Sequence, residues 1–191
     1  MKNIPSLVLC LYVVSANFGL AQPVAQPNSI KGDISAFHGN QDTLVNAIQA
    51  AEKATGGKVM DIRFSNVNSV PAYQMVIVKG GQVQYYKIQE PLTNVIELDV
   101  SSRPVWMLNW RGKAEVHFAK QASVSLSQAI RTAEQASYAP AVAAGIARSA
   151  SNPESDVKAY TVLLDVRGDV RSVSIDVTTG EVIADPSALS Y

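Results

Sequence analysis

One twelve-residue pattern occurs twice in this chain, and it constrains the fold more than any other feature. The copies occupy residues 43–54 and 125–136, and six of their twelve positions are identical. In each copy Leu, Ala, Ile and Ala recur at positions i, i+3, i+4 and i+7, the spacing of one apolar helix face. A repeated helix that opens two strand-rich segments predicts a duplicated domain. The later match of Ala72-Tyr73 with Ala159-Tyr160 extends the repeat beyond the helices.

The first copy introduces a helix followed by an antiparallel meander. Asp42 or Thr43 can cap the helix, and Gly56-Gly57 ends it. Alternation over residues 58–64 predicts a strand with Met60, Ile62 and Phe64 directed inward. The other strands that we expect in this unit are 73–78 and 83–88, joined by the tight turn Gly80-Gly81, then 95–100, and a hairpin of 105–110 with 114–118 about Arg111-Gly112.

The second copy predicts the same order of elements. Ser125 and Gln128 form a capping-box pattern, and Pro140 ends the helix. The expected strands are 142–148, 160–166, 170–177 and 181–183. The predicted fold class is therefore α+β, with two similar units, each a helix packed on a small antiparallel β-meander sheet. The first unit covers residues 42–120 and the second covers residues 121–191.

The N-terminus has the features of a secretory signal. Lys2 supplies a positive charge, Ile4–Val14 is apolar, and Gly19-Leu20-Ala21 offers small residues for cleavage after Ala21. A membrane anchor is the alternative, but the apolar run is shorter than the roughly 20 residues that a span requires. We therefore predict a signal peptide at 1–21, a lead-in arm at 22–41 and a periplasmic or secreted protein with no membrane span after cleavage.

Several functional classes lack support in the sequence. The formal net charge is zero with scattered cations, which gives no reason to expect nucleic acid as a partner. Cys10 is the only cysteine and leaves with the signal, so a disulfide or thiolate site is not expected. The two histidines, His38 and His117, stand far apart and outside recognisable motifs. Asp165, Asp169, Asp176 and Glu181 fit solvated turn or outward positions. We predict no catalytic residues, no metal site and no cofactor, and we do not expect an enzyme.

Aromatic residues supply the candidate binding site. Trp106 and Trp110 would share one face if residues 105–110 form a strand. Packing in a core or between the units is favoured for them, and anchoring of a protein interface is the alternative. Of the neighbours Tyr85 and Tyr86, one ring should face inward and one outward. The candidate binding residues are Trp106, Trp110 and Tyr86. An exposed edge of the meander could also add a partner strand.

The second unit resembles a PepSY domain. The matching segments are Val124–Ile130 at the helix start, Ala159–Val162, and Val173–Ile183 with its Asp-Val-x-x-Gly-Glu-Val ending. The first unit resembles a degenerate copy that keeps Asp99-Val100 but has Arg103-Pro104 where the Gly-Glu pair should be. The resemblance implies a helix packed on a small antiparallel sheet, in a family found in exported bacterial proteins and peptidase propeptides. It supplies no catalytic residue.

Together these features favour an exported, non-enzymatic binding module of two PepSY-like units. The resemblance implies a protein partner, with a peptidase or another envelope protein as candidates. The alternative is a small-ligand carrier that would use a cavity between helix and sheet.

Overall fold

The computed structural model describes residues 43–67, 70–89, 94–97, 102–146 and 159–183. Its helices are α2 (Leu44–Thr55), the short 3-10 helix η1 (Val105–Met107), α3 (Trp110–Gln121) and α4 (Leu126–Ser137). Its strands are β1 (Lys58–Val67), β2 (Val70–Lys79), β3 (Gln82–Gln89), β4 (Asn94–Glu97), β5 (Arg103–Pro104), β6 (Ala141–Ile146), β7 (Ala159–Val166), β8 (Asp169–Asp176) and β9 (Val182–Ile183). The predicted signal peptide, the lead-in arm, His38 and Asp99-Val100 lie outside these residues.

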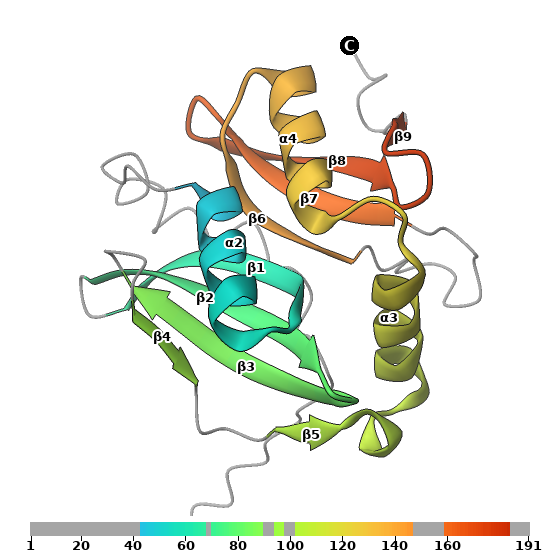
Figure 1. Ribbon diagram of the computed structural model, residues 1–191. Helices are drawn as coiled ribbons and strands as arrows, with labels where there is room; N and C mark the ends of the chain where they lie inside the picture. Colours follow the sequence, from blue (N-terminus) through green and yellow to red (C-terminus); the bar gives the residue numbers. More distant parts are fainter. Residues whose placement is uncertain (1–42, 68–69, 90–93, 98–101, 147–158, 184–191) are drawn as a thin grey trace, which may run out of the picture.

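All the described strands belong to one antiparallel sheet. Its order is β4-β3-β2-β1-β6-β7-β8-β9, and β5 pairs with β3 beside that path. The helices α2 and α4 contact each other and lie over the same face of the sheet (Figure 1). The α+β prediction of two similar units, each a helix on an antiparallel meander, is confirmed. The two meanders are joined into one continuous sheet through β1 and β6.

The junction between the units has a local two-fold pattern. Asp61 pairs with Gly145, Ile62 with Ala144, and Arg63 with Ala143. Asp61 and Ala143 stand at equivalent positions of the two units, as do Arg63 and Gly145, because the repeats are 82 residues apart. The pairing is therefore centred on Ile62 and Ala144, and each central strand meets the other in the same way.

The helix ends follow the local chemistry that the sequence indicated. Thr43 caps α2, its hydroxyl oxygen accepting the Asn46 amide at 3.3 Å, and Gly56 ends the helix in the left-handed conformation at φ 68°. Ser125 and Gln128 form the complete capping box of α4. That helix ends at Tyr138, which also adopts the left-handed conformation. The predicted caps at Thr43 and Ser125 and the predicted end of α2 at Gly56 are confirmed, whereas the last helical residue of α4 is Ser137, before the predicted stop at Pro140.

Both central strands contain a β-bulge, and this corrects one prediction. The registers shift between Val59 and Asp61 in β1 and between Ala141 and Ala143 in β6. The extra residue in β1 is Met60, which is buried but belongs to the cluster on the opposite face from Ile62 and Phe64. The prediction that all three share one inward face is wrong for Met60, because a bulge breaks the two-residue alternation of a strand.

The main core fills the layer between the two helices and the sheet. It includes the repeated apolar residues of both helices and the equivalent tyrosines Tyr73 and Tyr160, which are 0% and 2% exposed. A second cluster lies on the other face at one end of the sheet. Its members are Met60, Val76, Val78, Val83, Leu108, Val116 and Ala119. This cluster seats η1 and α3 on the sheet.

The segment 105–118 differs most from the sequence expectation. The predicted hairpin of 105–110 with 114–118 is wrong, since the chain forms η1 and α3 there. The side chain of Asn109 caps α3 by accepting the Gly112 amide at 2.9 Å, so Gly112 lies in the first helical turn and not at a strand reversal. Lys, Ala, Glu and Gln are good helix formers, and they make up much of α3.

Candidate protein-binding surface

Three large apolar side chains on η1 and the start of α3 are directed to solvent. Trp106 is 73% exposed, Met107 is 61% exposed and Trp110 is 58% exposed. We call these three residues the aromatic surface. The favoured sequence interpretation, that the tryptophans pack in a core or between the units, is wrong because the segment is helical and turns both rings outward. Met107 was not singled out in the sequence, although it lies between the two tryptophans.

The aromatic surface stands on a backbone that is fixed to the sheet. The Val105 amide donates to the Gly81 carbonyl oxygen at 2.8 Å, which ties η1 to the turn between β2 and β3. The next residue after η1, Leu108, is 5% exposed and packs in the second cluster. The position of the tryptophans is therefore set by buried neighbours rather than by a loop that must be ordered on binding.

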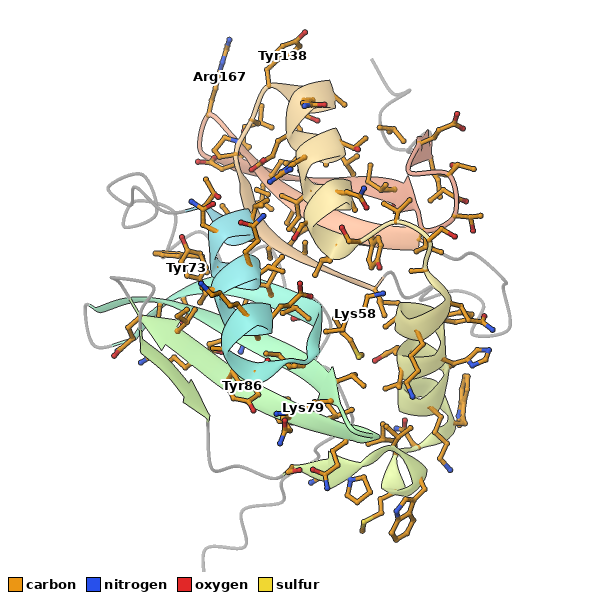
Figure 2. All side chains as sticks on the ribbon, in the orientation of Figure 1. Lys58, Tyr73, Lys79, Tyr86, Tyr138 and Arg167 are labelled. Atoms are coloured by element: carbon orange, nitrogen blue, oxygen red, sulfur yellow. The ribbon has the colours of Figure 1, made fainter. Side chains whose placement is uncertain are left out.

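The C-terminal part of α3 is held in the same way. Val116 and Ala119 are 2% and 3% exposed and face the sheet. The Lys58 ammonium donates to the Ala119 carbonyl oxygen near the end of α3, and Figure 2 shows Lys58 beside this helix. A cation at the C-terminal end of a helix also interacts favourably with the helix dipole. Anchoring at both ends makes α3 a firm support for its exposed side.

The exposed side of α3 carries positive charge. Trp110, Lys113, His117 and Lys120 are exposed, and spacings of three and four residues place them along one stripe. Glu115 is the single acidic residue in the segment 102–121 and is 7% exposed. The surface next to the tryptophans is therefore cationic as well as aromatic.

Tyr86, the third candidate binding residue, lies elsewhere. It is 7% exposed and belongs to the main core, and its hydroxyl donates to Gln84 Oε1 at 3.1 Å. Tyr85 is partly buried and packs against the second cluster on the other face. The tyrosines thus divide between the faces, and the structure does not bring Tyr86 to the aromatic surface.

The histidine and carboxylate candidates do not form a reactive cluster in the described residues. His117 is exposed on α3, and its ring lies 6.3 Å from that of Phe118 between centroids. The described part of the chain holds no group of three or more His, Cys, Asp or Glu residues placed to bind a metal. Among the helices of that part, none has both the length and the apolar content to cross a bilayer.

Two of the aspartates hold turns. Asp165 is 2% exposed, and its carboxylate accepts the Gly168 amide at 2.7 Å, so the expectation of a solvated position is wrong for this residue. Asp176 accepts the Thr178 and Thr179 amides at 2.7 and 2.8 Å. These hydrogen bonds, that from Thr179 first, lower the pKa of Asp176 below its ordinary value. Both carboxylates therefore have structural partners in the backbone.

The repeated glutamate has a structural role that the helix pattern did not reveal. Glu52 Oε1 accepts the Val59 amide at 3.0 Å, and Glu134 Oε1 accepts the Ala141 amide at 2.9 Å. Each carboxylate thus joins its helix to the residue before the bulge in the following strand. Burial, and to a lesser extent the charge of Glu52, raises the pKa of Tyr160 to about 12. A glutamate of the first unit therefore acts on a core tyrosine of the second.

Comparison with known proteins gives one family match. Residues 123–185 match the PepSY family model, described as "Peptidase propeptide and YPEB domain". No curated protein matches the chain. A crystal structure of a candidate lipoprotein from Clostridium difficile 630 aligns with 16% identity over 76% of this chain and 94% of that chain, at a TM-score of 0.41. The family match therefore covers the second unit alone, from α4 to β9.

Proposed function

We propose that the protein is an exported, non-enzymatic module that binds a protein partner through the aromatic surface. The observation that carries the proposal is the exposure of Trp106, Met107 and Trp110 on a firmly packed support. Covering both indole rings would remove roughly 250 Å² of apolar surface from water, or about 6 kcal/mol before the costs of association. Aromatic side chains that are clustered and held in place in this way are typical binding hot spots.

The first unit is, in this proposal, a degenerate PepSY copy. Both units have a helix followed by three antiparallel strands and a short edge strand. Both also have a bulge after a strand residue whose amide binds a helix glutamate. In the sequence, the aromatic surface falls after α2 and before α4. Within the described residues, the second unit has no segment that corresponds to it. Binding would then be a property added to the first unit.

A peptidase is the candidate partner that the PepSY match supports, because the family description names peptidase propeptides. The match also fits an exported protein, in the periplasm or outside the cell. The proposed binding role rests on exposed side chains and requires no catalytic residue. The alternative is a small-ligand carrier, but in the described residues the layer between the helices and the sheet is filled by the side chains of the main core.

The test is capture of exported proteins from the source organism on three immobilised forms of the protein. These are the unmodified chain, the double variant Trp106→Ser/Trp110→Ser, and the control Tyr138→Ser. Tyr138 is 97% exposed and lies at the far end of α4, as Figure 2 shows. We expect a partner that binds the first and third forms but not the second, and a captured peptidase should lose activity when the pure chain is added. Equal capture by all three forms would refute binding through this surface.

A further inference from the structure

We infer that the partner presents an acidic segment to the aromatic surface. This inference rests on the proposed function and adds the chemistry of the partner. Lys113 and Lys120 are exposed on the same stripe of α3 as Trp110. A partner segment that runs from the indole rings along this stripe would pass Lys113 first and then Lys120, about 15 Å along the helix axis from Trp110.

The segment that carries the aromatic surface contains more cations than acids. Residues 102–121 contain Arg103, Arg111, Lys113 and Lys120 against a single acid, Glu115, while the whole chain has no net charge. Glu115 is 7% exposed, so its carboxylate is not presented to a partner. The chain thus concentrates positive charge where it also exposes apolar rings. Complementary charge across an interface speeds encounter and excludes partners of like charge.

An acidic protein segment fits this surface better than an anionic membrane does. An amphipathic helix binds a bilayer by burying its apolar side among the lipids. The apolar side of α3 already packs on the sheet through Val116 and Ala119, and three apolar side chains remain outside. Clusters that bind anionic lipid surfaces usually contain four to eight cations. Segment 102–121 contains four, at the lower limit of that range, and two of them, Lys113 and Lys120, are exposed on the stripe of α3.

The arrangement divides the work of binding between two kinds of side chain. Centrally placed aromatic rings, once desolvated, mainly set how slowly a complex dissociates. Charges on the rim mainly set the association rate and its dependence on salt. Trp106 and Trp110 would then control dissociation, and Lys113 and Lys120 would control association.

The first experiment selects random twelve-residue peptides displayed on phage against the purified protein. The selected peptides are then tested against Trp106→Ser/Trp110→Ser, and those that need the tryptophans are counted for acidic and basic residues. We expect these peptides to be rich in Asp and Glu. Tryptophan-dependent peptides that are neutral or basic would overturn the acidic partner and leave the proposed function standing. If no peptide depends on the tryptophans, the aromatic surface is not a binding site and both proposals fail.

The second experiment measures association and dissociation rates of synthetic versions of those peptides. Lys113→Glu/Lys120→Glu should slow association about tenfold, and raising NaCl from 50 to 500 mM should have a similar effect. The control Lys53→Glu/Arg131→Glu makes the same change in net charge on exposed positions of α2 and α4. Equal slowing by both double variants would refute a local charge effect.

A third arm tests the membrane directly. Because the chain has two tryptophans and both lie on the aromatic surface, tryptophan fluorescence, excited selectively over the tyrosines, reports on this surface. Vesicles of phosphatidylcholine with about one third phosphatidylglycerol should leave the emission unchanged. A blue shift that is lost in Lys113→Glu/Lys120→Glu would identify a lipid surface as the occupant and overturn the protein partner.

Discussion

Replacing Glu134 tests whether the helix carboxylate holds the bulged strand in place. Glu134 Oε1 accepts the Ala141 amide at 2.9 Å, and Ala141 is 1% exposed, so water cannot readily replace the carboxylate. A hydrogen bond to a charged group stabilises a protein by about 1.5–3 kcal/mol. Alanine has a slightly higher helix propensity than glutamate, which offsets a few tenths of a kcal/mol. We therefore expect Glu134→Ala to lower the free energy of unfolding by about 1.5–2.5 kcal/mol.

Urea denaturation of the purified protein, followed by circular dichroism, measures this loss. Glu134→Gln keeps an acceptor oxygen but not its charge, and charged hydrogen bonds are about twice as strong as neutral ones. That variant should therefore lose about half as much. Gln135→Ala, at the adjacent exposed position, is the matched control and should remain within about 0.5 kcal/mol of the unmodified chain. If Glu134→Ala behaves like Gln135→Ala, the carboxylate does not stabilise the bulge and the reasoning is refuted.

Three further predictions concern the junction of the units and the titration of two side chains. Gly145→Ala would place a methyl group against the Asp61 carboxylate and should lower the free energy of unfolding, measured in urea, by about 1–3 kcal/mol. Adding Asp61→Ser should restore most of that loss. An unchanged loss in the double variant would exclude this clash. Tyr160 stays neutral in the folded state up to a pKa of about 12, whereas the unfolded side chain ionises near 10, so stability should fall as pH rises through that interval. Tyr160→Phe, which also loses the hydrogen bond to the Val124 carbonyl, should be less stable at pH 7 but show a shallower fall, and parallel alkaline profiles would contradict this. The pKa of Asp176 is below its ordinary value of 3.8, so the stability that its ionised carboxylate contributes is complete above pH 3.8 and is lost as pH falls through the lowered pKa. Asp176→Asn should therefore weaken the dependence of the unfolding free energy on acid pH. An unchanged acid profile would contradict the role of Asp176 in the turn.

The sequence predicted the features that depend on local chemistry. Thr43, Ser125 and Gln128 formed the expected caps because a side chain can bind an amide of its own first turn wherever the helix later packs. Gly80 and Gly81 formed the expected turn because both adopt positive φ, which glycine does without strain. The apolar faces of α2 and α4 followed from their spacing in the same way.

Features set by distant contacts could not be read from the sequence. Residues 105–118 alternate well enough to suggest strands, but Val116 and Ala119 are buried by strands of the sheet that lie far away in the chain. The exposure of Trp106 and Trp110 follows from the packing of α3 on the sheet. Their spacing in the sequence alone therefore favoured a buried position, which is wrong. Likewise, Val59, the residue before the bulge at Met60, donates its amide to a carboxylate of α2, and no local pattern in the strand predicts the bulge.

The two-fold pairing of β1 with β6 has a consequence for how many units such a chain can hold. In a solenoid each repeat offers its neighbour a fresh copy of the surface that it has just used, so repeats can be added without limit. Here the two units meet through the equivalent strand of each, as subunits do in an isologous dimer. Once β1 and β6 have paired, neither of these two edges is available to a further unit. Among the described strands, the ends of the sheet are β4 and β9, which have four and two residues and are unlike the junction. The arrangement of the two similar units therefore matches that of a two-fold dimer whose subunits are linked in one chain.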